Sequence, residues 1–303
     1  MSDGARWIEV AVEVTGTDAE LVADLLRQGC TGGVAIEAPS RLDRENDAYV
    51  PDGDAPALVK GYLAAGDDVE RSLRSMQLAL QTAPLQSPPR WHEARELAEA
   101  DWRDSWKKYF GIQRIGRNVV IAPSWIEYAG KPDETVVRID PGMAFGTGQH
   151  PTTSMCLAAL EEFVRAGASV LDLGCGSGIL AIAASLLGAG RVLAIDIDPQ
   201  AVKAAAENAA ANSVAVDVRE GSLSADAAPA ERFDIVVANI SGVALERLAG
   251  AIAAALNGGG RLIASGFLED RVDGLSAVFS AAGLSVERVV EDGVWRAMVA
   301  RRP

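Results

Sequence analysis

The segment that most constrains the fold spans residues 170–180 and reads VLDLGCGSGIL. Its first four residues predict a short buried strand that carries one carboxylate, Asp172. Glycines at alternate positions follow, beginning with Gly174 and Gly176, and they allow the backbone to turn sharply and to approach a ligand closely. We expect a helix to begin near Ser177 and to direct its free N–H groups toward that ligand. The segment therefore predicts a strand, a ligand-binding turn and a helix in succession.

The acid that follows the next predicted strand indicates a nucleoside ligand. Residues 191–195 are mostly apolar and lead into Asp196, roughly 20 residues beyond the turn, where nucleotide-binding βαβ units place the acid that accepts the ribose hydroxyls. Residues 176–181 also fit the dinucleotide pattern G-x-G-x-x-A, so an NAD-dependent oxidoreductase is one alternative. A single match of that kind is a weak signal.

The charge of Asp172 favours a different cofactor. A carboxylate beside the glycine turn would repel a pyrophosphate, and it would attract a sulfonium and an α-ammonium group. S-adenosyl-L-methionine carries both of these cations and no phosphate. An apolar run with Asp-x-Gly-x-Gly-x-Gly, followed by a strand that ends on Asp196, resembles the Rossmann-like methyltransferases. We therefore expect S-adenosyl-L-methionine to be the cofactor.

Length and composition limit the remaining possibilities. A chain of 303 residues is long enough for two domains. No apolar run approaches the ~20 residues of a membrane helix, and the first residues lack the features of a signal peptide, so we expect a soluble, cytoplasmic protein without a membrane partner. The net charge of −14 argues against direct nucleic-acid binding and favours a basic protein partner. Three widely spaced cysteines and two histidines predict no metal site.

Residues 1–90 predict a small N-terminal domain. The predicted elements follow the order β-α-β-β-α-β, which is typical of a ferredoxin-like α+β fold. This segment holds 15 acidic and eight basic side chains, a net charge of −7. We interpret it as a recognition module for a basic partner, and a merely solvated acidic surface is the alternative.

A linker at residues 91–115 and a catalytic domain at residues 116–303 are expected to follow. Within the linker, Trp102, Trp106 and Tyr109 share one face of a predicted helix, and we expect them to pack against the catalytic domain. In that domain a parallel sheet is finished by an antiparallel hairpin at residues 284–300, which resembles the seven-stranded sheet of methyltransferases. The predicted fold class is thus α/β, with a Rossmann-like domain and a smaller N-terminal domain.

A glycine-rich loop at residues 140–153 precedes the nucleoside-binding segment. Its glycines and Phe145 predict a flexible cover for an apolar ligand surface. We expect Thr152 or Thr153 to cap the following helix at residues 154–164, with a spare hydroxyl for the carboxylate of a bound amino acid.

Six motifs resemble those of the ribosomal protein L11 methyltransferases. They are AFGTGQHPTT at 144–153, DLGCGSGIL at 172–180, IDIDPQA at 195–201, VANI at 237–240, the segment DW to WKKYF at 101–110, and IAPSW at 121–125. The resemblance implies an N-terminal domain that grips ribosomal protein L11, a linker helix, and a methyltransferase domain that methylates lysines and the N-terminal amine of that protein. The chain departs from many members in having Ser241 and Gly242 after the VANI motif.

Asn239 is the candidate catalytic residue, because it ends a predicted buried strand at the same sheet edge as Asp172 and Asp196. Methyl transfer from a sulfonium to an amine needs alignment and a neutral nucleophile, and we interpret Asn239 as orienting the amine. The alternative is a strand-end cap that only shapes the pocket. A methyltransferase for a different protein lysine and a non-catalytic binding module also remain open, and we expect a monomer. The candidate cofactor-binding residues are Phe145, Thr152, Thr153, Asp172, Gly174, Gly176, Asp196 and Asn239.

Overall fold

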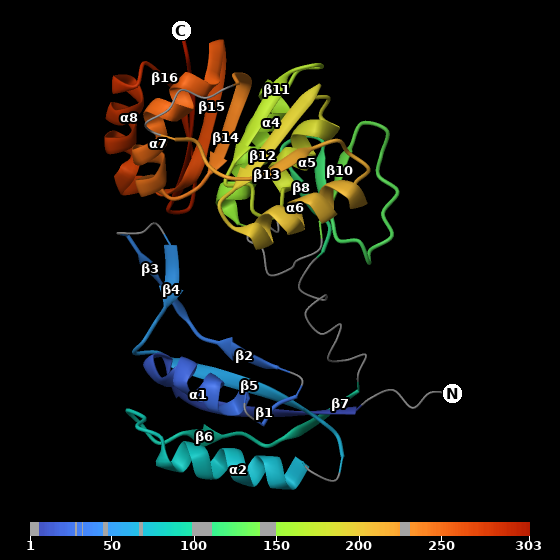
Figure 1. The fold of residues 1–303 in the computed structure, drawn as a ribbon, viewed down its shortest axis with the longest axis vertical. Coiled ribbons are helices and arrows are strands. Elements are labelled where there is room, and N and C mark those ends of the chain that lie inside the picture. The colour runs from blue at the N-terminus through green and yellow to red at the C-terminus, as the bar shows by residue number, and fades with distance from the viewer. Residues whose placement is uncertain are drawn as a thin grey trace. The chain divides into compact units, whose positions relative to one another are not determined.

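The computed structural model describes most of the chain and divides it into two compact units (Figure 1). The described residues are 6–27, 29–31, 33–44, 48–66, 69–98, 111–139, 150–224 and 231–303. The first unit is Met1–Asp43 with Tyr49–Tyr109, and the second is Arg44–Ala48 with Phe110–Pro303. Among the described helices, none combines the length and the apolar character that crossing a membrane would require. The predicted aromatic helix and the loop at 140–149 fall outside the described residues.

The first unit is a sheet with two helices. Its elements are β1 (Arg6–Thr15), η1 (Gly16–Asp18), α1 (Ala19–Arg27), β2 (Val34–Glu37), the small pair β3 (Ser40–Asp43) and β4 (Ala48–Pro51), β5 (Pro56–Ala64), α2 (Val69–Thr82), β6 (Arg90–Trp91) and β7 (Arg95–Ala98). The strand order is β2-β5-β1-β6, and β7 also pairs with β1. Alternating buried residues of β1 and β5, such as Val10 and Val59, form a core with Leu26 of α1 and Met76 of α2. Residues 90–98 therefore belong to the sheet of this unit.

The second unit is built on a seven-stranded sheet. Its elements are β8 (Gln113–Ile115), β9 (Val119–Ala122), β10 (Thr135–Arg138), α4 (Pro151–Phe163), β11 (Ser169–Leu173), α5 (Ile179–Leu186), β12 (Arg191–Asp196), α6 (Pro199–Ala211), β13 (Asp217–Glu220), β14 (Phe233–Asn239), α7 (Gly242–Ala255), β15 (Leu256–Leu268), η3 (Glu269–Arg271), α8 (Val272–Ala281), β16 (Ser285–Asp292) and β17 (Trp295–Arg301). The order of the large sheet is β13-β12-β11-β14-β15-β17-β16, and β10-β9-β8 form a small separate sheet. A mixed α/β fold is therefore confirmed.

Each face of the large sheet is covered by its own helices. One core joins the sheet to α4, α5 and α6 through residues such as Leu160 and Ile182. The other core joins it to α7 and α8 through residues such as Ile252 and Phe279. The central strands are buried on both faces, which explains why β11 and β14 are nearly continuous apolar runs.

The strand order creates one switch point. From β11 the chain adds β12 and then β13 on one side, and it then crosses to β14 on the other side of β11. All of these strands are parallel, so their carboxyl ends lie at one edge of the sheet. The connection that follows β11 leads to β12 on one side, and the connection that follows β14 leads to β15 on the other side. A crevice for ligands is expected between these two connections.

Candidate active site

A glycine turn joins β11 to α5 at the switch point. Gly174, Gly176 and Gly178 have φ angles of 76°, 53° and 80°, which side chains rarely tolerate. The backbone N–H of Gly174 donates to the carbonyl of Ile195 at 2.9 Å, so the turn is fastened to β12. A Cβ on Gly174 would lie 2.4 Å from Cγ2 of Ile240. The turn therefore requires glycine both for its conformation and for its packing. The helix α5 begins at Ile179 with Gly178 as its cap, close to the predicted start near Ser177.

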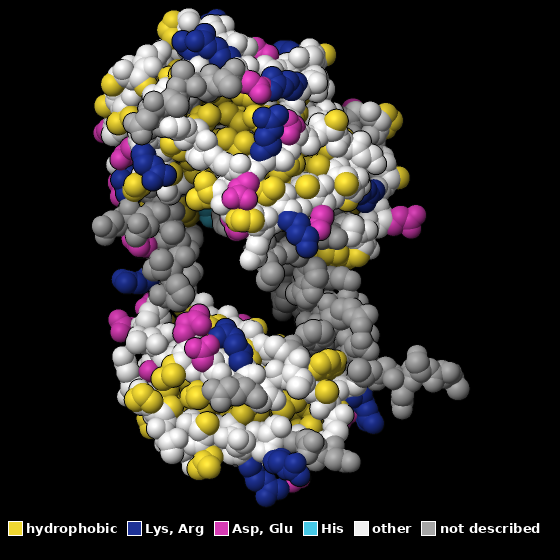
Figure 2. All heavy atoms as spheres, in the orientation of Figure 1, with side chains coloured by type: hydrophobic (Ala, Val, Ile, Leu, Met, Phe, Trp, Pro, Cys, Tyr) yellow, Lys and Arg dark blue, Asp and Glu magenta, His cyan; other side chains and the backbone are white. Residues whose placement is uncertain are grey.

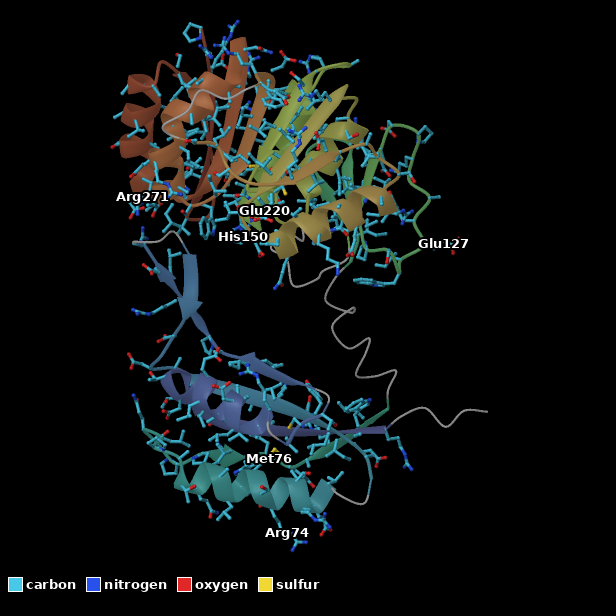
Figure 3. The ribbon with its side chains drawn as sticks, in the orientation of Figure 1. Arg74, Met76, Glu127, His150, Glu220 and Arg271 are labelled. Atoms are coloured by element: carbon cyan, nitrogen blue, oxygen red, sulfur yellow. The ribbon has the colours of Figure 1, made fainter. Side chains whose placement is uncertain are left out.

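A cleft of about 280 Å³ opens beside this turn. Its lining comes from the turn, from the carboxyl ends of β11, β12 and β14 and the residues after β13, from the starts of α4 and α5, and from the first half of α7. The lining residues are Thr153, Leu173, Gly174, Cys175, Gly176, Ile179, Leu180, Asp196, Ile197, Gly221, Ser222, Asn239, Ile240, Ala244, Arg247 and Leu248. Figure 3 shows Glu220 and His150, which are close in sequence to lining residues, along the same edge of this unit. Five of the eight predicted cofactor-binding residues thus come together in one cleft: Thr153, Gly174, Gly176, Asp196 and Asn239.

Asp196 is half-buried at the end of β12, and both of its oxygens are held by backbone donors. The N–H of Gly176 donates to Oδ2 at 2.9 Å, and the N–H of Asp198 donates to Oδ1 at 3.0 Å. A carboxylate has about four lone-pair sites, so each oxygen can still accept a second donor. The carboxylate is thus fixed in direction while it keeps capacity for two hydroxyl groups.

Asp172 lies beneath the turn and is fully buried. Its Oδ2 accepts a hydrogen bond from the N–H of Ala181 at 3.0 Å, and its Oδ1 has no partner within the described residues. Burial raises the pKa of this carboxyl to about 7; the Ala181 hydrogen bond opposes the rise and the charge of Asp196 adds to it. Asp172 is not among the lining residues. Any effect of Asp172 on a ligand would therefore be exerted from below the cleft, through its charge and through the helix start.

Asn239 and Thr153 meet across the cleft. The Nδ2 of Asn239 donates to Oγ1 of Thr153 at 3.3 Å, which links the end of β14 to the first turn of α4. The Oδ1 of Asn239 is buried and accepts no hydrogen bond within the described residues. A buried carbonyl oxygen without a donor is costly, so this atom is suited to receive an N–H group from a ligand.

Comparison with known proteins assigns the chain to a family. The family described as ribosomal protein L11 methyltransferase (PrmA) matches residues 6–303. The chain belongs to this family. A relative named ribosomal protein L11 methyltransferase from Chloroflexus aurantiacus is 42% identical, with 98% of each chain covered. One of the same name from Heliobacterium modesticaldum is 41% identical, again with 98% of each chain covered. A crystal structure of a ribosomal protein L11 methylase from Lactobacillus delbrueckii is 34% identical, with a TM-score of 0.58 over 64% of this chain and 99% of that one.

In this L11 methyltransferase family member, His150 rather than a threonine caps α4. The helix begins with Pro151 at its first position, and the side chain of His150 accepts from the N–H of Thr152. Our expectation that Thr152 or Thr153 is the cap was therefore wrong, because proline at the first position sets the helix start one residue after His150. Thr152 is buried outside the cleft lining, with its Oγ1 2.7 Å from Nδ1 of His150. Phe145 lies outside the described residues, so its covering role stays a prediction.

Several lining residues of the L11 methyltransferase cleft were not predicted from the sequence. Ile197 follows the acid of β12 and is 75% exposed, so an apolar side chain next to Asp196 was an available signal. Gly221 and Ser222 reach the cleft because they follow β13 at the same edge of the sheet. Ala244, Arg247 and Leu248 of α7 had no local signal, because only the packing of α7 onto the sheet brings them to the cleft.

Proposed function

We propose that this chain binds S-adenosyl-L-methionine in the cleft and methylates lysine side chains and the N-terminal amine of ribosomal protein L11. The observation that carries the proposal is the switch-point cleft, where Asp196 keeps acceptor capacity and the buried Oδ1 of Asn239 lacks a donor. Relatives that cover nearly the whole chain are named for methylation of L11, which supports the choice of substrate. When bound, S-adenosyl-L-methionine supplies an electrophilic methyl group on a positively charged sulfur.

The cleft residues fit the parts of this cofactor. Asp196 would accept the ribose hydroxyls, and the absence of side chains at Gly174 and Gly176 would allow close approach of the cofactor to the backbone. Thr153 would bind at the amino-acid end, near the start of α4. Ile197 offers an apolar surface for the base. The two cationic groups of the ligand would favour the ionised form of Asp172, whose pKa burial raises to about 7, and the ionised carboxylate would attract them from beneath the cleft.

Asn239 would orient the acceptor amine. Its Oδ1 can accept an N–H of the amine, which directs the nitrogen lone pair away from Asn239 and toward the reacting carbon. The ordinary pKa of lysine is near 10.4, and moving the ammonium into a half-enclosed apolar cleft lowers it, so that the neutral amine becomes accessible. An asparagine cannot act as the base, so its contribution would be alignment. A role in shaping the cleft alone is the alternative, and the two are distinguished by whether Asn239→Ala lowers kcat or only weakens cofactor binding.

The first unit would recognise L11. Its strand order, β2-β5-β1-β6 with two helices, supports classing it as a ferredoxin-like domain. Figure 2 shows acidic and basic side chains mixed over the visible face of each unit rather than separated into large patches. On this face, a basic partner would therefore be recognised by particular acidic side chains.

Labelling of purified ribosomal proteins tests the proposal. The protein is incubated with S-adenosyl-L-methionine carrying a labelled methyl group and with all of the ribosomal proteins, and the label is located by mass spectrometry. We expect label in L11, on lysines and the N-terminal amine, and none with Asn239→Ala in the same time. Label in a different protein would reassign the substrate. Calorimetry decides the cofactor: binding of NAD, with no binding of S-adenosyl-L-methionine, would instead favour an oxidoreductase.

A further inference from the structure

A second hollow, which we call the edge groove, lies in the second unit between β8, α4 and β16. It encloses about 780 Å³. Met155 and Ala158 of α4 line it, together with Ile115 from β8 and Val290 from β16. The apolar part of the lining thus comes from three elements, and charged side chains complete it: Arg114, Glu162, Arg288, Glu291 and Asp292. None of these residues has a place in the proposed handling of the cofactor.

One wall of the edge groove is the outer strand of the large sheet. In the part of the chain that is described, β16 pairs only with β17, so its other edge presents unpaired backbone groups. Val289 on this strand is 42% exposed. The stretch of β16 that lines the groove, residues 288–292, is about 13 Å long, and the matching stretch of α4, residues 154–162, is about 12 Å long. About four residues of an extended peptide would fit along this wall as an added strand.

The edge groove begins beside the cofactor cleft. Asp292 pairs with Trp295, and Trp295 pairs with Leu268 at the carboxyl end of β15, so this end of the groove lies at the same sheet edge as the cleft. On α4, Thr153 lines the cleft, whereas Ser154 lines the groove. A peptide in the groove would thus present its next side chain to the cleft.

At the end of the edge groove nearest the cleft, the charged side chains favour a cationic occupant. At the end of the groove away from the cleft, Arg288 and Glu162 form an ion pair at 2.9 Å. Glu291 is paired with Arg296 at 3.4 Å. Asp292 is exposed, and within the described residues it forms no ion pair with a lysine or arginine. Its negative charge lies near His150, where it raises the pKa of His150 against the larger lowering caused by burial.

We propose that the edge groove binds an extended segment of the protein substrate, about four residues long, which adds to β16 and leads the acceptor amine into the cleft. This inference rests on the proposed function, because it assigns a second contact surface to the same substrate. The apolar lining would hold alternate side chains of the segment, and Asp292 would attract the positive charge that accompanies the acceptor amine.

Two variants and a matched control test the edge groove in the full-length protein. Ala158→Trp fills the lining, and Asp292→Lys reverses the charge at the end nearest the cleft. Glu207→Lys makes the same charge change on exposed α6, which contributes nothing to the groove. Measured with intact ribosomal protein L11, Ala158→Trp should raise KM about tenfold, and Asp292→Lys should lower kcat/KM about fivefold, more at low salt. Both should bind S-adenosyl-L-methionine as the wild-type protein does, and Glu207→Lys should match the wild type in both assays.

Wild-type kcat/KM for L11 in both groove variants would overturn the inference while leaving the proposed function intact. If Ala158→Trp does not fold, Asp292→Lys alone decides in the same way. Sedimentation provides a second criterion: a wild-type dimer that Ala158→Trp converts to a monomer would mean that a second copy occupies the groove, and the inference would be wrong. If the wild-type protein methylates no L11 at all, the proposed function fails and this inference fails with it.

Discussion

Asp196 and Asp198 stand two residues apart and have different partners. Asp196 faces the cleft, whereas the Oδ1 of Asp198 accepts from the N–H of Gln200 at 2.8 Å and caps α6. We expect Asp196→Ala to weaken binding of S-adenosyl-L-methionine by ~1.5–3 kcal/mol, because hydrogen bonds from hydroxyls to a charged group are lost. Asp198→Ala should instead cost ~0.5–2 kcal/mol of stability and leave affinity unchanged. Calorimetric titration and thermal unfolding of both variants check the contrast; equal affinity losses would remove the specific role of Asp196.

The buried carboxyl of Asp172 should leave a signature in the pH dependence of stability. Its pKa is raised from 3.8 to about 7 by burial. Between these values the unfolded chain has lost the proton that the folded chain keeps, so the free energy of unfolding falls as pH rises from about 4 to about 7 and then levels off. In Asp172→Asn this contribution is absent. The stability of the wild type relative to the variant should therefore decrease over that window, by a few kcal/mol in order of magnitude.

Asp234 provides a control, because its contribution to stability should change with pH in the opposite direction. Hydrogen bonds, first from the backbone N–H of Ser169 and then from the side chain of Asn257, lower its pKa. Its contribution to the free energy of unfolding is therefore present above the ordinary pKa of an aspartate and is lost as pH falls. Relative to Asp234→Asn, the wild type should lose stability on acidification. Urea unfolding of the wild type, Asp172→Asn and Asp234→Asn from pH 3.5 to 8 measures both changes. If the difference in stability between the wild type and Asp172→Asn does not change with pH, the argument that burial raises the pKa of Asp172 is wrong.

Single residues were easiest to place where they end a strand. Asp196 and Asn239 could be placed at the cleft because the carboxyl ends of parallel strands share one edge. Asp172 was placed on the right strand, but its complete burial depends on how α5 covers it, and that packing has no local sequence signal. The same holds for Arg247, which reaches the cleft from the interior of α7.

At the level of elements, the turn after β11 requires glycine, whereas the interior of a helix does not. Gly174→Ala would place a side chain in a left-handed conformation and against Ile240, and we expect a loss of roughly 1–3 kcal/mol of stability together with weaker cofactor binding. Gly250→Ala, in the exposed middle of α7 with open space around it, should gain up to ~1 kcal/mol. Chemical denaturation of the two variants measures both changes. A stable Gly174→Ala with normal affinity would show that the turn tolerates a side chain.

Element boundaries were less predictable than element types. The three glycines at 258–260 predict a turn before a strand at 261–265, yet β15 starts at Leu256 and runs through them. Leu256 pairs with Phe233 ahead of a register shift, so a tertiary contact extends the strand where local preference would end it. The start of α4 is a second case, since a proline and a histidine set it instead of the more usual threonine cap.

For the whole molecule, the resemblance to a known family predicted more of the architecture than the periodicity of apolar residues did. Alternating strands and helices predict a parallel sheet, but they do not determine that β14 lies next to β11 on the side away from β12. The family assignment is confirmed by relatives that match over nearly the entire chain. The partial alternation of apolar and polar residues from Trp91 to Leu97 predicts a single strand. The structure has two short strands there, β6 and β7, which pair separately with β1, and no local sequence signal marks the break between them.

The two units have separate hydrophobic cores, and this separation leads to the last prediction. The core of the first unit draws on residues 8–91, and the two cores of the second draw on residues 115–300. A protein beginning at Gly111 should therefore fold, unfold cooperatively and bind S-adenosyl-L-methionine within about threefold of the full-length affinity. It should lose about 100-fold or more in kcat/KM for intact L11, equivalent to ~3 kcal/mol of recognition, because the proposed recognition unit is gone. Full-rate methylation of L11 by the shortened protein would show that recognition resides in the second unit, whereas failure to bind cofactor despite a folded circular dichroism spectrum would show that the cleft depends on the first.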